Sequence, residues 1–485
     1  MGKLIETYKL EDFFGAGWFP AETDGIKKWA WSGKEAFLNF PPGHKGFSLE
    51  LSGCPVESAN LTLNYKSAKL AAYVLTGSLA KINIPPGTAS CGIKLADCWV
   101  PKEVLGTPDA RELGICLHNI GQLKLYSESG NQLPRIIEMS LTGICNIDPP
   151  CVMCVTRNSK SWQQRYHLPA GIIEEMMPYL NSAEFVSLHG VAGEPLLSPK
   201  LFDTLSRIDK KVYTMFATNG LLLTKEISGR LISAGLKEID FSIDAANAVT
   251  YSKIRNNNGF PALVKNIKQL ISLKKERGVS YPNIIINTVI MKENMPELPA
   301  FIDFAHELGV SLARLRFLVP AAENYEVNTD RFSFNYFKQR VDPNSNEFQR
   351  IMAIVKDKAT KYGVTVTSDN PEISALLNPS PQRNMRMNKI ELTLVGDIPQ
   401  KYLGVIQQEP SCKRPWESVL VYLDGDVRFC CHTHQIIGNL NNNSFIEIWN
   451  GQQAQIIRKN FLQNQWPKQC LPCPLHRLQI QAWQN

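Results

Sequence analysis

The sequence predicts an α/β protein in which a parallel sheet lies between a β-rich region and a cysteine-rich module. Three observations point to this fold class. Short apolar segments alternate with helix-like segments from about residue 134 to residue 320. Strand-like segments bounded by Gly and Pro fill about the first 130 residues, and eight of the twelve cysteines gather at two later places. Each pattern predicts a different part of the fold.

Residues 134–320 predict six consecutive pairs of a strand and a helix. Helical patterns such as GIIEEMMPYL and FPALVKNIKQLISLKKERG separate the strand-like segments. Strands joined in this way pair in parallel, and eight pairs would close a full barrel. Six pairs therefore predict a partial (β/α)6 TIM-like barrel. The expected strands span residues 136–143, 185–190, 212–220, 239–244, 284–291 and 313–319.

The regions on either side of the barrel have different patterns. Residues 1–130 predict a β-sandwich, because runs such as GFSLELSG and NLTLNYKS alternate with turn residues. Residues 321–404 are less regular and contain one clear helix, so we expect them to extend the barrel or to act as a linker. Residues 405–485 are expected to form the small cysteine-rich module.

Composition and charge exclude several classes of function. The chain is 44% hydrophobic and 20% charged, as in globular proteins, and its net charge of +7 comes without a dense Lys/Arg tract. We therefore expect no nucleic-acid partner. No run of about 18 apolar residues is present, and the first residues lack the apolar stretch of a signal peptide. We expect a cytoplasmic protein without a membrane span, in which cysteines seldom form disulfides.

The first cysteine group, Cys145, Cys151 and Cys154, directly follows the first predicted barrel strand. Loops at the carboxyl ends of barrel strands build active sites. Three thiolates bind three irons of a 4Fe-4S cluster and leave the fourth iron open to a ligand. A structural zinc ion normally takes four ligands, and the closest downstream histidine is His167, so zinc is the weaker interpretation.

This loop and four later motifs resemble those of the radical S-adenosylmethionine (radical SAM) enzymes. The family's usual spacing is C-x3-C-x2-C, whereas this chain has C-x5-C-x2-C, with the extra residues within 148–150. The later motifs follow successive predicted strands in the family's order. They are Gly193-Glu194-Pro195, Thr218-Asn219-Gly220, Ser242-Ile243-Asp244 and Tyr251-x-x-Ile254-Arg255.

The resemblance implies two cofactors at this loop. One is a site-open 4Fe-4S cluster on Cys145, Cys151 and Cys154, and the other is S-adenosylmethionine, bound to the open iron. The implied contacts with S-adenosylmethionine are Met153, Ala192, Gly193, Glu194, Thr218, Asn219, Ser242, Asp244 and Asn287.

The resemblance also suggests separate roles within this set. Residues 192–194 would hold the methionyl amine of the cofactor. Ser242 and Asp244 would contact its ribose, and Asn287 its ribose or carboxylate. Met153 would pack near the adenine.

The second cysteine group begins at Cys412 and continues through a predicted hairpin with Asp424-Gly425 at its turn. It resembles the SPASM/Twitch extension of radical SAM enzymes. The resemblance implies one auxiliary 4Fe-4S cluster, although four cysteines with a C-x2-C pair are also a zinc pattern. The implied ligands are Cys412, Cys430, Cys470 and Cys473.

Cys431, the fifth cysteine of this group, has three interpretations. It is a buried thiol, a substitute ligand for Cys430, or a donor of a hydrogen atom to a substrate radical. The last interpretation would make it a catalytic residue.

Aromatic motifs in the first region suggest a carbohydrate link. Phe14–Pro20, Trp29-Ala30-Trp31 and Asp109–Gly114 resemble parts of a β-sandwich found beside bacterial glycosyltransferases. Exposed tryptophans would stack on sugar rings, whereas tryptophans in the sandwich core are an equally good interpretation.

The function implied by the resemblance is reductive cleavage of S-adenosylmethionine to a 5′-deoxyadenosyl radical, which takes a hydrogen atom from a substrate. A sugar or other small molecule, or a peptide, is the expected substrate. Flavodoxin or ferredoxin is the expected electron donor. The alternative is a non-catalytic iron–sulfur or zinc scaffold with a binding β-sandwich.

Overall fold

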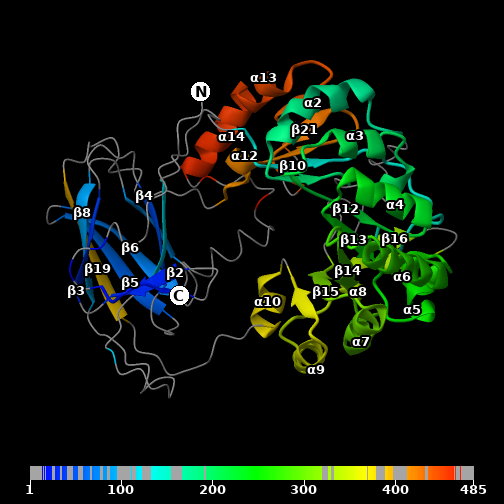
Figure 1. Ribbon diagram of the computed structural model, residues 1–485, viewed down its shortest axis with the longest axis horizontal. Coiled ribbons are helices and arrows are strands. Elements are labelled where there is room, and N and C mark those ends of the chain that lie inside the picture. Colours follow the sequence, from blue (N-terminus) through cyan, green and yellow to red (C-terminus); the bar gives the residue numbers. More distant parts are fainter. Residues whose placement is uncertain are drawn as a thin grey trace. The chain divides into compact units, whose positions relative to one another are not determined.

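The computed structural model divides the chain into two compact units (Figure 1). Met1–Tyr126 and Pro379–Pro410 form the first unit, and Ser127–Asn378 and Ser411–Asn485 form the second. The structure describes residues 14, 16, 18–23, 28–32, 35–40, 47–52, 58–65, 68–76, 80–84, 88–95, 111, 116–122, 133–154, 166–189, 193–318, 326–328, 332–368, 370–377, 388–396, 412–431, 435–463, 465 and 470.

The first unit contains two five-stranded sheets, with strand orders β1-β2-β9-β4-β7 and β3-β8-β19-β5-β6. Leu38 and Leu49, one from each sheet, are fully buried. The strands are β1 (Glu22–Thr23), β2 (Lys28–Trp31), β3 (Glu35–Asn39), β4 (Phe47–Ser52), β5 (Ser58–Tyr65), β6 (Ala68–Thr76), β7 (Ala80–Ile84), β8 (Thr88–Leu95), β9 (Cys116–Gln122) and β19 (Asn388–Gly396).

Strand β19 corrects part of the expectation that residues 321–404 extend the barrel or act as a linker: β18 (Thr365–Thr367) does extend the barrel sheet, but β19 does not. It lies inside the second sheet of the first unit, parallel to β5 and antiparallel to β8. Backbone hydrogen bonds to both neighbours bind it there, because a strand in a sheet interior has two partners. The sequence alone does not show such pairing, since β19 follows β8 by almost three hundred residues.

The second unit is built on a ten-stranded sheet with the order β18-β15-β14-β13-β12-β11-β10-β20-β21-β22. Neighbours from β18 to β20 are parallel, and β21 and β22 continue the sheet antiparallel. The strands are β10 (Ile136–Met139), β11 (Phe185–Ser187), β12 (Tyr213–Thr218), β13 (Glu238–Ser242), β14 (Asn283–Ile290), β15 (Leu312–Phe317), β18 (Thr365–Thr367), β20 (Ser418–Val421), β21 (Asp426–Arg428) and β22 (Gly438–Asn439).

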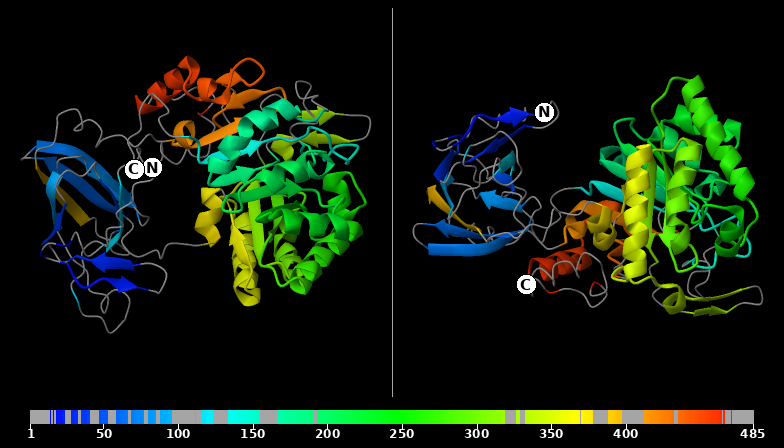
Figure 2. Two further views of the ribbon diagram at one scale, coloured as in Figure 1. Left: turned by 45° about the horizontal axis from the view of Figure 1, so that its top comes forward. Right: turned by 90° about the horizontal axis from the view of Figure 1, so that it is seen from below.

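The six expected barrel strands correspond to β10–β15, so the predicted partial (β/α)6 barrel is confirmed. The helices cover the sheet (Figures 1 and 2). They are α2 (Ala170–Ser182), α3 (Leu201–Arg207), α4 (Lys225–Ala234), α5 (Ala248–Arg255), α6 (Phe260–Glu276), α7 (Leu298–Leu308), α8 (Tyr336–Gln339), α9 (Asn346–Tyr362), α10 (Pro371–Leu377), α12 (Arg414–Glu417), α13 (Phe445–Trp449) and α14 (Gln452–Leu462).

Smaller elements complete the unit, and none of the helices in the described ranges has the length and apolar character needed to span a membrane. The remaining elements are η2 (Pro195–Leu197), η3 (Met295–Glu297), β16 (Glu326–Asn328) and β17 (Ser333–Asn335).

Side chains on the central strands alternate between two environments, as period two requires. One set is apolar, and burying each of its members stabilises the fold by about 1.5–3 kcal/mol. The other set is polar and points to the opposite face of the sheet, the barrel interior. The apolar set, all 0% exposed, is Ile137, Val186, Phe216, Phe241, Ile286 and Leu315. The polar set includes Glu138, Ser187, Asp240, Asn287 and Arg314.

Capping residues define the ends of the barrel helices. The hydroxyl of Thr224 accepts a hydrogen bond from Ile227 N at 3.2 Å and begins α4, and Gly235 ends it with a φ of 84°. Asn247 begins α5 by accepting hydrogen bonds from two backbone amides. These caps satisfy helix-end groups that would otherwise lack partners.

The cysteine-rich region is joined to the barrel sheet rather than separate from it. Strand β20 pairs in parallel with β10, the strand that precedes the first cysteine group. Helix α14 contacts α12 through the fully buried Arg458, which donates to Pro415 O at 2.9 Å and to Trp449 O at 2.8 Å. Its guanidinium also stacks on the Trp449 ring, 4.5 Å from the centroid. Arg458 thus ties three segments of this region together.

Arg458→Ala should destabilise the second unit by about 2–5 kcal/mol, because it leaves two buried carbonyls without donors and opens a cavity. Urea unfolding followed by tryptophan fluorescence measures this loss. The matched control is Lys459→Ala on the exposed face of the same helix, which should change the free energy of unfolding by less than about 0.5 kcal/mol. Equal midpoints for both variants would contradict the role given to Arg458.

Candidate active site

The first cysteine group lies on the loop that leaves β10, at the carboxyl ends of the parallel strands. Cys151 is 8% exposed, and Cys145 and Cys154 are half-buried. None of the eight cysteines whose side chains the structure describes forms a disulfide. Burial raises the pKa of Cys151 to about 11, although Arg255 opposes this shift. A positively charged metal centre would reverse it, since coordination deprotonates a thiol.

The loop after β11 approaches the cysteine loop so closely that only glycine fits. Gly193 has a φ of 80°, and a Cβ atom on it would lie 2.0 Å from Thr142 O. The next residue, Glu194, donates its backbone N–H to Ile144 O at 2.8 Å. The Gly-Glu motif of the sequence therefore holds the start of the cysteine loop through its backbone.

The carboxylate of Glu194, which is 1% exposed, accepts three hydrogen bonds. Its Oε1 accepts from Thr218 Oγ1 at 2.6 Å and from Leu196 N at 3.2 Å, and its Oε2 accepts from Asn219 N at 2.8 Å. Burial raises the pKa of Glu194, and these three donors oppose the shift. The carboxylate thus joins the end of β11 to the end of β12. Its expected contact with a methionyl amine stays a prediction.

Asn219 extends this network to the first cysteine. Its Nδ2 donates to Asn146 Oδ1 at 2.8 Å and lies 3.9 Å from Cys145 Sγ. At the start of the loop, the hydroxyl oxygen of Thr142 lies 3.0 Å from His167 Nδ1. Of the predicted residues, Asn219 therefore contacts the cysteine loop directly, and Thr218 is linked to it through Glu194.

Asp244 follows β13 with a φ of 62° and is 1% exposed. Its Oδ1 accepts from Val289 N at 2.6 Å, and its Oδ2 pairs with Arg255 NH2 at 2.5 Å. Burial raises the pKa of Asp244, while Arg255 opposes the shift. The structure gives this carboxylate protein partners, whereas Ser242, the last residue of β13, is only half-buried.

Buried polar atoms without partners mark the place where a cofactor would fit. Within the described ranges, Asn287 Oδ1, the Tyr251 hydroxyl and Arg255 Nε are buried and have no hydrogen-bond partner. Asn287 lies beside Ser242 in the sheet register. Native structures rarely leave such atoms unsatisfied, and a polar group bound beside them would satisfy them. The hydroxyls of a ribose would satisfy Asn287 Oδ1.

No three Cys, His, Asp or Glu side chains in the described part of the chain converge as ligands of one metal ion. A cubane cluster is larger than one ion, because four irons and four sulfides lie between its thiolates. Met153 and Val152, next to the third cysteine, pack against the buried residues Ile254, Met291 and Leu318. This apolar cluster borders the cysteine loop on one side, where an adenine ring would be shielded from water.

Charged and polar side chains line the barrel interior. Arg314 NH1 donates to Asp240 Oδ2 at 2.6 Å, and burial raises the pKa of Asp240 to about 6 despite Arg314 and Arg316. Burial lowers the pKa of His189 to about 4, and Arg316 adds to this shift. The imidazole is therefore neutral at pH 7, with Nδ1 2.9 Å from Ser187 Oγ.

The second cysteine group gathers around Arg414. Its guanidinium lies 3.2 Å from the carboxylate of Glu138 on β10. Burial disfavours the charge of Arg414, but Glu138 and the thiols of Cys430, Cys431 and Cys412 raise its pKa overall. Cys470 is 4% exposed, and Cys431 is exposed, which disagrees with its interpretation as a buried thiol. The predicted residues Cys473 and Ala192 lie outside the described residues.

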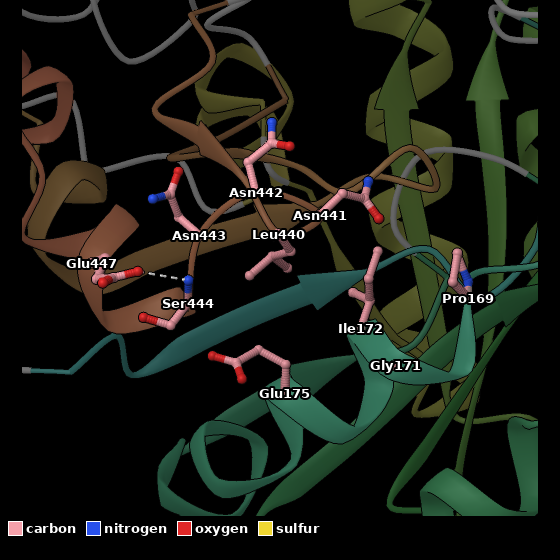
Figure 3. Close-up of a pocket in the computed structure, with 10 residues that line it drawn as sticks. All are labelled: Pro169, Gly171, Ile172, Glu175, Leu440, Asn441, Asn442, Asn443, Ser444 and Glu447. Carbon is pink, nitrogen blue, oxygen red and sulfur yellow. Dashed lines mark hydrogen bonds between the residues drawn. The ribbon is translucent and has the colours of Figure 1, made fainter.

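A polar surface pocket lies between α2 and the segment that leads into α13 (Figure 3). Its two carboxylates are engaged: Glu175 accepts from Phe445 N at 2.8 Å, and Glu447 accepts from Ser444 N at 3.0 Å. The Tyr179 and Phe445 rings, with centroids 4.4 Å apart, pack next to this contact. The pocket is therefore part of the joint between the barrel and the C-terminal module.

Sequence reasoning missed three residues of the first site. Asn146, Arg255 and Asn256 all contact the cysteine loop or its partners. Arg255 and Ile254 belong to the Tyr251-x-x-Ile254-Arg255 motif, but the motif does not indicate which side chains the arginine contacts. A charged residue at the last position of a short helix is the one local signal for it.

Comparisons with known proteins agree with this geometry. Residues 139–305 match the model of the radical SAM superfamily, and residues 412–474 match that of SPASM, an iron–sulfur cluster-binding domain. The chain thus contains a radical SAM domain and a SPASM domain. The first domain implies a 4Fe-4S cluster and S-adenosylmethionine, and the second binds auxiliary iron–sulfur clusters. Because the superfamily and the relatives are enzymes, the matches favour an enzyme over the alternative of a non-catalytic scaffold.

Relatives with curated functions cover different shares of the chain. The AdoMet-dependent heme synthase of Methanosarcina barkeri is 27% identical over 67% of this chain and 84% of its own length. A tungsten-containing aldehyde ferredoxin oxidoreductase cofactor-modifying protein of Pyrococcus furiosus is 28% identical over 38% of this chain and 52% of its own. The mycofactocin maturase MftC of Mycobacterium tuberculosis is 24% identical over 42% of this chain and 49% of its own length. The chain thus spans about half the length of the last two relatives.

Solved structures that are similar to this chain include that of Streptococcus suis SuiB bound to precursor peptide SuiA. It is 13% identical, with a TM-score of 0.49, and the alignment covers 71% of this chain and 70% of that one. The structure of anSMEcpe with bound AdoMet is 17% identical, with a TM-score of 0.46 over 71% of this chain and 88% of that one.

Gly193→Ala should displace the cysteine loop, because its Cβ would overlap Thr142 O and alanine is strained at this φ. The purified variant should hold about four fewer irons per chain than the wild type after anaerobic reconstitution. Iron and sulfide assays measure this. The matched control is Gly171→Ala in α2, where a Cβ meets no atom within 4 Å and the iron content should not change. A Gly193→Ala protein with full iron would contradict the close approach.

Proposed function

We propose that this enzyme uses S-adenosylmethionine, held at the loop of Cys145, Cys151 and Cys154, to take a hydrogen atom from a peptide or a polar small molecule. One observation carries the proposal: three thiols lie on a single loop at the carboxyl ends of parallel strands, and polar groups from the loops after β11 and β12 and from the end of α5 hold that loop. Three thiolates suit a cluster that keeps one iron open.

The cofactors supply chemistry that no side chain has. When bound, the reduced cluster and S-adenosylmethionine supply a 5′-deoxyadenosyl radical that abstracts a hydrogen atom. The chain's part is to orient the cofactor and to exclude water from the reaction. Reduced flavodoxin or ferredoxin is the expected source of the electron.

Residues around the loop suit these tasks. The orphan oxygen of Asn287 and the half-buried hydroxyl of Ser242 are placed to bind ribose hydroxyls. Met153, with its buried neighbours, provides an apolar surface for the adenine. Glu194 and Asp244 act through their protein partners, as positioning residues for the loop rather than through direct contact.

The second cysteine group would hold one auxiliary 4Fe-4S cluster on Cys412, Cys430, Cys470 and Cys473. Arg414 supports this, since a half-buried cation beside several thiols offsets the negative charge of a thiolate-bound cluster. Cys431 remains either a substitute ligand or a hydrogen-atom donor. Its exposed side chain favours the donor role over burial in the core.

The substrate class rests on the barrel interior. His189, Asp240 and Arg314 provide hydrogen-bonding groups on the face that a bound substrate would contact, so a polar substrate is favoured. The names of two relatives, a heme synthase and a cofactor-modifying protein, refer to small molecules. The carbohydrate link has no further support, because the side chains of Trp29 and Trp31 lie outside the described residues.

The proposal predicts S-adenosylmethionine cleavage by the reconstituted enzyme. With dithionite, the wild type should release 5′-deoxyadenosine, and Cys151→Ala should lower this rate to the background while keeping the auxiliary irons. Anaerobic chromatography of the product and an iron assay measure both.

The matched control is Cys91→Ala. Cys91 is equally buried but lies in β8 of the first unit, so its loss should leave cleavage unchanged. A wild type that binds about one metal without sulfide and cleaves nothing would contradict the proposed function.

A further inference from the structure

The end of helix α5 holds the part of the cysteine loop in which the spacing departs from the usual one. Ile254 O accepts a hydrogen bond from Val152 N at 3.0 Å. Asn256 Nδ2 donates to Pro150 O at 2.6 Å, from a backbone with a φ of 49°. Two backbone groups of the longer loop are thus fixed by residues two positions apart on α5 and its C-cap.

Arg255 lies between these two contacts and reaches the ligand itself. Its NH1 donates to Cys151 Sγ at 3.6 Å, and its NH2 pairs with Asp244 Oδ2 at 2.5 Å. Arg255 is 9% exposed and Asp244 is 1% exposed. Each of residues 254–256 therefore makes a hydrogen bond with one of residues 150–152, and the guanidinium of Arg255 donates to the sulfur of Cys151.

We propose that Arg255 is a positioning residue that fixes Cys151 as a cluster ligand and, through its N–H···S hydrogen bond, favours the reduced state of the site-open cluster. This inference rests on the proposed function, since it needs a cluster on that loop. It assigns a role to an arginine on α5 that is not itself a cluster ligand.

The physical reason is a difference in charge between two oxidation states. Reduction adds one electron to the cluster, so a donor or cation at a ligand sulfur stabilises the reduced state more than the oxidised state. The low dielectric of a buried site strengthens this effect. Reduction must precede cleavage of S-adenosylmethionine, so this equilibrium bears on the first step of the reaction.

Asp244 keeps the guanidinium in place rather than cancelling its effect. Asp244 is itself fixed by two hydrogen bonds. Val289 N donates to its Oδ1 at 2.6 Å, and Asn294 Nδ2 donates to the backbone oxygen of Asp244 at 2.9 Å. The carboxylate binds NH2, while NH1 faces Cys151. Cys151 Sγ therefore faces an N–H group of Arg255 and not the carboxylate of Asp244.

The test is a redox titration of the full-length, reconstituted enzyme with dithionite, followed by electron paramagnetic resonance. The signal that changes on adding S-adenosylmethionine reports the site-open cluster. In Arg255→Gln, the ratio of reduced to oxidised cluster at a given potential should fall about tenfold, which is about 59 mV for one electron. Arg255→Lys, which keeps the charge, should recover most of this loss.

The matched control is Lys253→Gln, which removes a charge from the exposed side of the same helix and should leave the potential unchanged. A wild-type potential in an Arg255→Gln enzyme with full iron overturns the inference. If Arg255→Gln holds no cluster, Arg255→Lys decides: a near-wild-type potential supports the inference, and any other result overturns it. A wild type without a signal that responds to S-adenosylmethionine contradicts the proposed function as well.

Discussion

The buried carboxylate of Glu194 is the interaction on which the arrangement of the first site depends. It lies in the loop after β11 and accepts hydrogen bonds from Thr218 and Asn219 at the end of β12 and from Leu196 N in its own loop. Its backbone amide donates to the start of the cysteine loop. Burying a carboxylate costs several kcal/mol, and three charge-assisted hydrogen bonds of about 1.5–3 kcal/mol each offset that cost. The charge is therefore stable only while the end of β12 stays beside the loop that follows β11.

A second buried charge performs the same task at the other end of the loop. Asp244 and Arg255 form an ion pair that reaches Cys151, so the loop is held near both its first and its second cysteine. Such preorganisation means that the ligands are oriented before the cofactor binds, and little ordering entropy opposes cluster binding. The auxiliary site follows the same principle, because β20 pairs with β10 and Arg414 pairs with Glu138 on that strand.

The sequence predicts much of the barrel because its strands and helices have local patterns of period two and 3.6. It also places the Gly-Glu, Thr-Asn and Ser-x-Asp motifs at strand ends, where the structure brings them together. It does not reveal that β19 joins the first unit or that β20 continues the barrel sheet, because both pairings connect residues far apart in the chain. Nor does it show that Glu194 and Asp244 bind other side chains, since a carboxylate that binds a cofactor and one that positions a loop have the same local sequence.

The central claim is that the Glu194 network orders the loop that holds the site-open cluster. Mössbauer spectroscopy of reconstituted Glu194→Gln, which has nearly the same shape, tests this most directly. One donor that now faces a carboxylate oxygen would face an NH2 group, so the network would lose a hydrogen bond. We expect the auxiliary cluster to be retained and the site-open cluster to be largely lost. Full occupancy of both clusters would contradict the account.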